Sequence, residues 1–361
     1  MAFNVDYTVC IAVMALLTAV YVIAGGYMAT AINDFIQGIV MLVGIVAIIY
    51  SVLKIHGGFS GSLAALAEVS DPAASTVPGV FASFFGPDPA GLAGVILLTS
   101  LGTWGLPQMV QKFYSIKSEQ SIHTGTIIST LFAIIVAGGC YFLGGFGRIF
   151  NVDVASKGYD EIIPTMLSNL SPLIIGITLI LVLSASMSTL SSLVLTSSST
   201  LTLDFIVPLS KKKDEKKTLI IIRAFILVFI IISAVIAVIQ YKNKITFIAQ
   251  LMGLSWGALA GSFLAPFLYS LYWKKVTKSA CAVSFIWGSG IMIANMLFGS
   301  HFPTIIQSPV NCGAFAMLAS LVIVPVVSLI TKKPEKKFVD DIFSCYDRKV
   351  TVPVSEVLEE K

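Results

Sequence analysis

The sequence predicts an all-α polytopic membrane protein with about nine transmembrane helices. Two observations are compositional: 56% of the 361 residues are hydrophobic, whereas only 12% are charged. Soluble domains carry about 25% charged residues, so this chain has too little polar surface for a water-exposed fold. The third observation is a series of apolar stretches, each near the ~20 residues that a helix needs to cross a bilayer. The net charge of +4 is spread over separate loops and gives no indication of nucleic-acid binding.

Nine stretches are long and apolar enough to be spanning helices. They cover residues 7–24, 35–53, 89–110, 124–147, 172–203, 219–241, 245–273, 279–299 and 310–331. The fifth is long enough to extend beyond the membrane. In the sixth, Arg223 lies one turn from the start, where its long stem lets the guanidinium reach the interface. A polar tail follows the last stretch, so we expect a partial transmembrane core over residues 1–333 and a tail over residues 334–361.

The basic residues predict the orientation of these helices in the cell membrane. One set of inter-helix segments and the tail hold 18 of the 23 lysines and arginines, and the opposite set holds five. The positive-inside rule places the richer set, and with it the C-terminus, in the cytoplasm. Nine spans then place the N-terminus outside, although nothing before Tyr7 is typical of a signal peptide. We therefore expect that earlier helices, encoded upstream of Met1, precede this sequence.

Two segments on the outer side are longer than simple turns. Residues 54–88, rich in Gly, Ala, Ser and Pro, are expected to lie over the outer mouth, although a loose connector fits them equally well. Residues 148–161 fit a partly solvated surface helix. At the start of that segment, Arg148 either attracts an anionic solute or anchors the outer interface, and we favour the anchor.

The fifth apolar stretch contains a dense run of hydroxyls, SASMSTLSS, at residues 184–192. On a helix, one face carries Ala185, Ser188, Thr189 and Ser192. Hydroxyl and carbonyl oxygens on such a face suit a small hard cation such as sodium, since magnesium and calcium normally recruit carboxylates and none lies between residues 161 and 204. Alternatively, the hydroxyls bond back to the preceding turn or join neighbouring helices.

Four ordered motifs resemble the sodium:solute symporter family over nearly the whole chain, from about residue 7 to 333. MSTLSS at residues 187–192 resembles the family's eighth core helix, and residues 25–37 resemble its GG…TDxxQ helix start. GTWGLPQ at residues 102–108, continuing to Lys112-Phe113, is similar to a third motif, with lysine where arginine is usual. The small-residue helix over residues 253–272 is the fourth. More weakly, residues 145–148 resemble the sodium/pantothenate branch.

The resemblance implies a LeuT-type inverted repeat of two five-helix units. Spans three to seven would form the second repeat, and spans one and two the last two helices of the first. The first three core helices, and one extra helix before them, have no counterpart in this sequence. In the family the broken first core helix supplies part of the sodium site, so we expect this chain to encode only half of that site.

The resemblance also implies site residues. The sodium ligands would be the carbonyl of Ala185 and the hydroxyls of Ser188 and Thr189. Asn33 and Asp34 open the second predicted span, where helix N-capping accounts for both. We favour capping for Asn33, and for Asp34 we keep a gating role open as well.

The third predicted span is interrupted by Gly102, Gly105 and Pro107, which free carbonyls to line a cavity or simply kink the helix. By resemblance this is a broken helix in which Trp104 and Gln108 contact the substrate. Trp256 is a further candidate for the substrate path, although core packing accounts for it better. Gly253, Gly257 and Gly261, spaced by four, predict a face for close helix packing.

The resulting hypothesis is a sodium-coupled secondary active symporter, not an enzyme, that imports a small organic solute by alternating access. Pantothenate, an amino acid, a sugar or a monocarboxylate all fit. The alternative is a truncated or partner-dependent membrane module of the same fold that does not transport. The sequence determines neither the solute, the sodium stoichiometry nor the oligomeric state.

Overall fold

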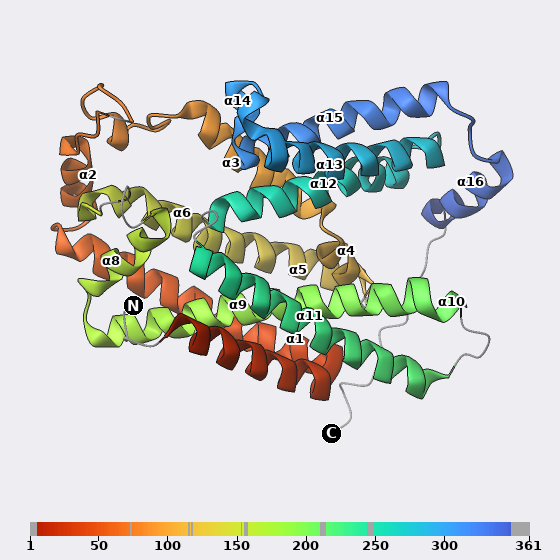
Figure 1. The fold of residues 1–361 in the computed structure, drawn as a ribbon, viewed down its shortest axis with the longest axis horizontal. Coiled ribbons are helices and arrows are strands. Elements are labelled where there is room, and N and C mark those ends of the chain that lie inside the picture. Colours follow the sequence, from red (N-terminus) through yellow and green to blue (C-terminus); the bar gives the residue numbers. More distant parts are fainter. Residues whose placement is uncertain are drawn as a thin grey trace. The chain divides into compact units, whose positions relative to one another are not determined.

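The computed structural model describes residues 6–72, 74–114, 116, 118–152, 154, 158–209, 214–243 and 248–347, and most of these are helical. Within these residues there is no β-strand, only an isolated bridge between Asp71 and Ser75. The helices form two compact units (Figure 1). One comprises Met1–Pro87 and Thr126–Ile248, and the other Asp88–Gly125 and Ala249–Lys361. The predicted boundary at residue 334 does not coincide with this division and stays a prediction.

The first unit begins with α1, Tyr7–Ile55, which contains the first two predicted spans. A straight helix of its 49 residues would be about 74 Å long, more than twice the thickness of the hydrocarbon core. Gly26 interrupts it with φ 58° and ψ −149°, a backbone conformation that essentially only glycine adopts. The chain turns back at this glycine. The start of α1 and the next helix, α2 (Phe59–Glu68), therefore lie toward the same end of the unit (Figure 1).

The turn at Gly26 corrects one expectation. Asn33 and Asp34 do not cap a second helix, since helical geometry resumes directly after the glycine and both residues lie inside α1. The N-cap of α1 is instead Asp6, whose carboxylate accepts hydrogen bonds from the amides of Thr8 and Val9.

Two further spans in the first unit are helices with a π-helical segment. The fourth predicted span is Gln120–Phe150, built from α5 (Glu119–Phe132), the π-turn η3 (Ala133–Ala137), α6 (Gly138–Gly145) and η4 (Phe146–Phe150). The fifth is Pro172–Leu209, which contains α9 (Pro172–Thr200), the π-turn η6 (Leu201–Ile206) and α10 (Val207–Leu209). At 38 residues this helix extends beyond the bilayer, as the sequence predicts.

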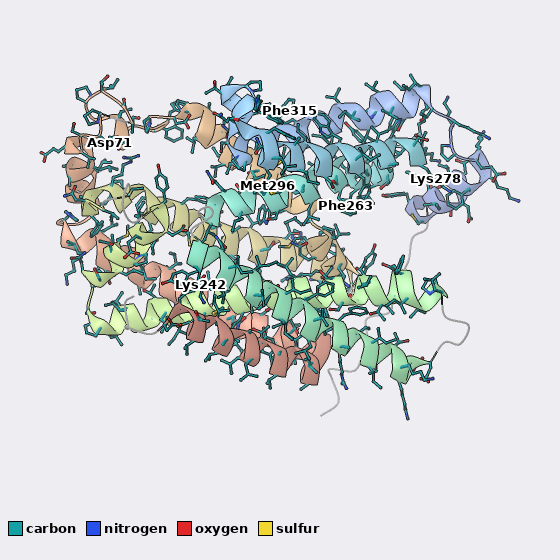
Figure 2. The ribbon with its side chains drawn as sticks, in the orientation of Figure 1. Asp71, Lys242, Phe263, Lys278, Met296 and Phe315 are labelled. Carbon is teal, nitrogen blue, oxygen red and sulfur yellow. The ribbon has the colours of Figure 1, made fainter. Side chains whose placement is uncertain are left out.

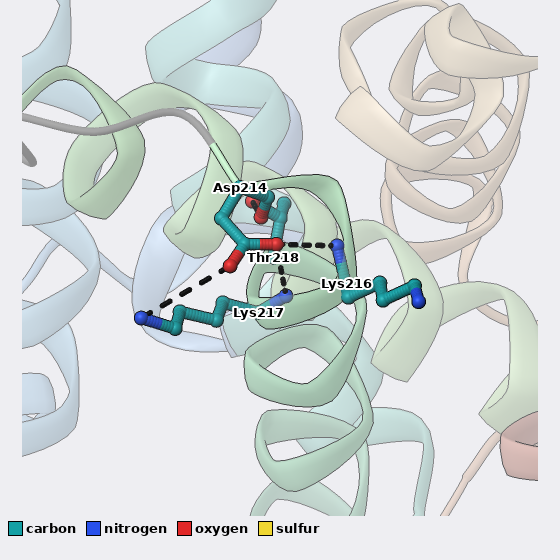
Figure 3. A network of polar contacts seen from close by, with 4 residues as sticks. All are labelled: Asp214, Lys216, Lys217 and Thr218. Atoms are coloured by element: carbon teal, nitrogen blue, oxygen red, sulfur yellow. Dashed lines mark hydrogen bonds and ion pairs between the residues drawn. The ribbon is translucent and has the colours of Figure 1, made fainter.

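The sixth predicted span is α11, Glu215–Asn243, which starts after a charged loop. Asp214 precedes it, and its Oδ1 accepts hydrogen bonds from the amides of Lys216 and Lys217 at 3.0 and 3.3 Å (Figure 3). Asp214 thus satisfies two of the amides that a helix start leaves without partners, and its charge also suits the helix dipole. This local chemistry fixes where the span begins.

The outer segments of the first unit are folded. They contain α2 (Phe59–Glu68), η1 (Val80–Ala82), η5 (Tyr159–Glu161) and α8 (Ile162–Ser168). Arg148 joins two of them, because its Nη1 lies 2.7 Å from Oδ2 of Asp71 and its guanidinium carbon 4.3 Å from the centre of the Phe81 ring. Figure 2 labels Asp71 in this loop. These contacts support the interpretation of Arg148 as an anchor rather than an anion-binding residue.

The second unit contains the broken third span and the last three spans. The broken span is α3 (Pro89–Gly102), η2 (Thr103–Gly105) and α4 (Pro107–Phe113). The others are α12 (Ile248–Tyr272), α13 (Lys278–Phe298) and α15 (Pro309–Ile330). Shorter elements follow α13 and α15: η7 (Gly299–His301), α14 (Thr304–Gln307), α16 (Lys336–Phe343) and η8 (Ser344–Asp347).

The predicted glycine face of α12 is confirmed as a packing surface. A β-carbon at Gly257 would lie 2.7 Å from the α-carbon of Gly313 on α15, and one at Gly261 would lie 3.0 Å from the β-carbon of Ala316. The core beside it is buried and apolar, with Leu98 and Met317 completely shielded from solvent. Small residues therefore allow α12 and α15 to approach more closely than larger side chains permit.

With α1 divided at Gly26 and α3–α4 taken as one broken span, the described helices account for all nine predicted spans. Several residues used for the orientation lie outside the described residues, namely 117, 157, 211–213, 244 and 348–361. The prediction that residues 54–88 lie over an outer mouth remains a prediction.

Candidate functional site

The hydroxyl run lies on α9, which packs chiefly along α1. Ser184, Ser191 and Ser198 recur every seven residues and are buried, so they mark the packed side of the helix. Ser188 and Ala185 lie progressively further round the helix and are half-buried, and Thr189 is exposed. The predicted ligand face thus runs from the packed side of α9, near Ser188, to its open side at Thr189.

Two of the three predicted ligands are in contact within the helix. The hydroxyl of Thr189 donates a hydrogen bond to the carbonyl of Ala185, with the two oxygens 3.0 Å apart. This is the back-bonding that the sequence allowed as the alternative to a sodium site. A hydroxyl that donates its proton keeps two lone pairs, however, and a carbonyl oxygen also has two. The Thr189 hydroxyl oxygen therefore stays able to contact a cation, whereas the Ala185 carbonyl, inside α9, accepts from both the Thr189 hydroxyl and the Thr189 amide of the helix.

A polar cluster on α1 lies next to this face. The hydroxyl of Tyr21 donates to the carbonyl of Met187 on α9 at 3.1 Å. Around Tyr21 lie Thr18, Asn33, Asp34 and Ser191, so residues from both halves of α1 and from α9 meet at one place. Asn33 and Asp34, which the sequence placed at a helix end, are instead part of a cluster inside the helix bundle.

The cluster contains buried polar atoms that form no hydrogen bond within the described chain. They are Oγ1 of Thr18 and Nδ2 of Asn33; Oε1 of Gln37, one turn beyond Asn33 on α1, is likewise buried without a hydrogen bond. Buried polar atoms in folded proteins nearly always have a partner, because leaving one without a hydrogen bond costs about 1–3 kcal/mol. This arrangement is therefore suited to hold water or an ion.

Sequence reasoning named Gln37 only as part of the TDxxQ motif and did not identify Thr18, Tyr21 and Ser191 as site residues. One local signal was present, since Asn33, Asp34 and Gln37 are spaced by three and four residues and so share one face of an otherwise apolar helix. The contact of Tyr21 with α9 had no such signal, because its partner Met187 lies 166 residues away.

The break in the third span is confirmed. The two helices α3 and α4 are bent by 48°, and Leu106 between them has the extended backbone angles φ −88° and ψ 118°. Pro107 has no amide hydrogen, so the carbonyl of Thr103 cannot accept the usual helical bond from it. Gly105 is required by packing, because a β-carbon there would lie 2.8 Å from the α-carbon of Ala260.

The three candidates for the solute path in the second unit, Trp104, Gln108 and Trp256, differ in their surroundings. Trp104 lies at the break with 58% of its surface exposed, and Gln108 follows it half-buried on α4. Trp256 packs against the core formed by α3, α12 and α15, and a β-carbon at Gly102 would lie 3.2 Å from its ring. Trp256 therefore fits core packing, whereas Trp104 and Gln108 stay candidates for a solute path.

Among the described residues, no group of three or more His, Cys, Asp or Glu side chains is arranged to hold a metal ion. Oxygens of Ser, Thr and backbone carbonyls are the ligands that this chain offers at α9, and these suit a hard cation.

The comparisons with known proteins agree on one family. The model of the sodium:solute symporter family matches residues 1–288. A sodium/proline symporter of Staphylococcus aureus is 29% identical over 92% of this chain, which covers 64% of that protein. The osmoregulated proline transporter of Bacillus subtilis is 27% identical over 93% of this chain and 66% of its own length. A sodium/pantothenate symporter of Haemophilus influenzae is 28% identical over 88% of this chain and 64% of its own length.

A solved structure shares the fold. It is a sodium-coupled sialic acid symporter in a substrate-bound outward-open state, similar to this chain with a TM-score of 0.67 at 19% identity. The match covers 92% of this chain and 69% of the solved one. The chain thus spans about two thirds of the length of the proteins that it resembles, and the predicted fold class is confirmed.

Proposed function

This chain belongs to the sodium:solute symporter family, and from this premise we propose that it carries out sodium-coupled uptake of a small organic solute across the cell membrane. The three relatives are named as transporters rather than enzymes, which supports a role without catalysis. They give no support to the alternative of a non-transporting module of the same fold. The solute would cross by alternating access around a site near the middle of the membrane.

The observation that carries this proposal is the hydroxyl face of α9. Sodium would be held by the carbonyl of Ala185 and the hydroxyls of Ser188 and Thr189. The position of these three residues on one side of α9 supports this assignment, as does the exposure of the Thr189 hydroxyl, whose oxygen keeps lone pairs beyond its hydrogen bond to Ala185.

Asp34 would guide sodium between this site and the cytoplasm. It lies eight residues beyond the turn at Gly26, which is about 12 Å along the helix, at the start of the second apolar stretch. A carboxylate next to a membrane-spanning stretch is costly to bury and typically marks an ion pathway. The cluster around Tyr21 supports this role, because it connects Asp34 to Ser191 on α9, one helical turn from Ser188.

We expect the solute to be an organic carboxylate. Proline and pantothenate, the solutes named for the relatives, both carry this group. Trp104 and Gln108 at the broken span would line its path, with the tryptophan ring providing apolar contact and the amide a hydrogen bond. The C-terminus would face the cytoplasm, as the distribution of lysine and arginine predicts.

Transport assays test the proposal directly. Protein purified from its own membrane and reconstituted in liposomes should accumulate labelled proline or pantothenate when an inward sodium gradient is applied, and not when choline replaces sodium. The solute should be recovered chemically unchanged. Ser188→Ala should weaken the sodium response, whereas Ser197→Ala should not, because Ser197 is exposed half a turn round the same helix. Uptake of either solute that ignores sodium would contradict the proposal.

A further inference from the structure

The short helix α16 has two chemically distinct faces. Its apolar residues are Phe338, Val339, Ile342 and Phe343, whereas Lys336, Lys337, Asp340 and Asp341 occupy the other side. At 100° per residue, the apolar residues cover one arc of about 140°. A helix with this division buries its apolar face against protein or lies at a membrane surface with that face in the lipid.

Contacts with α12 account for one edge of the apolar face. Nζ of Lys274 lies 3.1 Å from Oδ1 of Asp340 and 5.4 Å from the centre of the Phe343 ring. The hydroxyl of Tyr346, just beyond α16, donates to the carbonyl of Leu271 at 2.8 Å. The helix is therefore fixed at the end of α12, with Phe343 toward the protein.

The other edge of the apolar face is exposed. Phe338 and Ile342 have 60% and 52% of their surface open. They lie on one side of α16 because they are spaced by four residues. We call this open side the apolar stripe.

The short connection from α15 places α16 at the level of the membrane surface. Five residues separate it from the end of the spanning helix α15, a distance of at most about 20 Å when fully extended. Ile330 and Tyr272, which end α15 and α12, expose 79% and 74% of their surface, as lipid-facing residues do. The two contacts with α12 hold α16 beside this boundary.

The charges around α16 match an anionic surface. The segments 274–278 and 332–347 together carry seven lysines and four acidic residues. One of the acids, Asp340, is already paired with Lys274. Lys278 starts α13 at the same end of the second unit as α16 (Figure 2). Lysines next to a bilayer attract anionic lipid headgroups.

We propose that α16 is an interfacial helix whose apolar stripe of Phe338 and Ile342 enters the surface of the surrounding bilayer, while the adjacent lysines bind anionic lipid headgroups. The lysine-rich end of the second unit is thereby held at a fixed depth. The occupant of the stripe is lipid, because the stripe lies at the end of two spanning helices and beside a surplus of lysines. A protein partner would require neither feature.

Spin labels measure the depth of the stripe. In a background where the native cysteines are replaced by serine, Ile342→Cys and Lys337→Cys carry nitroxides on the apolar and polar sides of α16, in liposomes of equal phosphatidylglycerol and phosphatidylcholine. We expect the label at 342 to be more accessible to oxygen than to a water-soluble nickel complex, and the label at 337 to show the reverse. Equal nickel access at both positions would overturn the proposal.

Amide exchange of the unmodified protein provides the second measurement and does not depend on any substitution. Exchange over residues 336–347 should be at least about threefold slower in that mixture than in pure phosphatidylcholine, because lysines bind more strongly to the anionic surface. Equal exchange in both bilayers would also overturn the proposal. Protection that appears only with a co-purified protein would assign the stripe to a protein partner and refute the lipid assignment.

Discussion

Thr189→Ala separates the role of this residue in sodium binding from its role in folding. The hydroxyl is exposed, and its one hydrogen bond goes back to Ala185 within the same helix. Losing a bond of this kind costs at most about 1 kcal/mol of folding stability, and the better helix propensity of alanine recovers up to about 0.5 kcal/mol. We therefore expect the melting temperature to stay almost unchanged.

The effect on sodium should be much larger. An interaction of a polar group with a charge contributes about 1.5–3 kcal/mol, which corresponds to a factor of about 10–150 in affinity. The sodium concentration that gives half-maximal uptake in proteoliposomes should rise by this factor. Thr189→Ser keeps the oxygen and should stay within about threefold of the parent, whereas Thr189→Val keeps the shape and should behave like alanine.

Membrane insertion and sodium activation should thus respond differently to the loss of either hydroxyl. If Thr189→Ala and Ser188→Ala both leave the half-saturating sodium concentration unchanged, the sodium site on α9 is refuted. If Ser197→Ala weakens sodium activation as much as they do, the effect belongs to α9 as a whole and the assignment of these oxygens is also wrong.

Three further predictions concern the helices that position the sites. Gly257→Ala should lower stability by about 1–3 kcal/mol in detergent melting, because its β-carbon would lie 2.7 Å from the α-carbon of Gly313. Gly290→Ala, whose β-carbon meets nothing within 4 Å, should be neutral or stabilising. Equal changes in melting temperature for the two variants would show that close packing at Gly257 does not matter. Gly26→Ala should cost about 1–3 kcal/mol through its positive φ, and an unchanged melting temperature would show that the turn in α1 does not need glycine. Arg148→Ala should speed protease cleavage within residues 69–88 several-fold, because it removes the contacts with Asp71 and Phe81. An exposed ion pair and a cation–π contact each contribute up to about 1 kcal/mol. An unchanged cleavage rate would show that Arg148 does not hold this loop.

Much of the architecture follows from local sequence. The nine apolar stretches predict the spans because the hydrophobic thickness of a bilayer sets a minimum length that can be counted along the chain. The break at Gly102–Pro107 is equally local, since proline removes a helical hydrogen bond wherever it occurs. The hydroxyl face of α9 is a matter of helical periodicity, so the spacing of its residues is enough to place Ala185, Ser188 and Thr189 on one side of the helix.

The error at Asn33 and Asp34 shows the limit of this reasoning. Both residue types favour helix starts, and a glycine pair precedes them, so capping was a sound local interpretation. Gly26 turns the chain within a single residue, however, and the helix resumes at once. Residue propensity therefore predicted the wrong helix start, because it does not show how few residues a chain reversal needs.

Local sequence is enough to predict a bundle of membrane helices with a polar face on α9, a broken span before Pro107 and a tight-packing face on α12. The packed helices were needed to show that Tyr21 and Asp34 join that polar face, which side chains surround Trp256, and that Lys274 fixes α16 at the end of α12. The difference is one of range along the chain. Periodicity, caps and span length depend on neighbours within a few residues, whereas these three assignments depend on contacts between residues that are far apart in the chain and meet only when the helices pack.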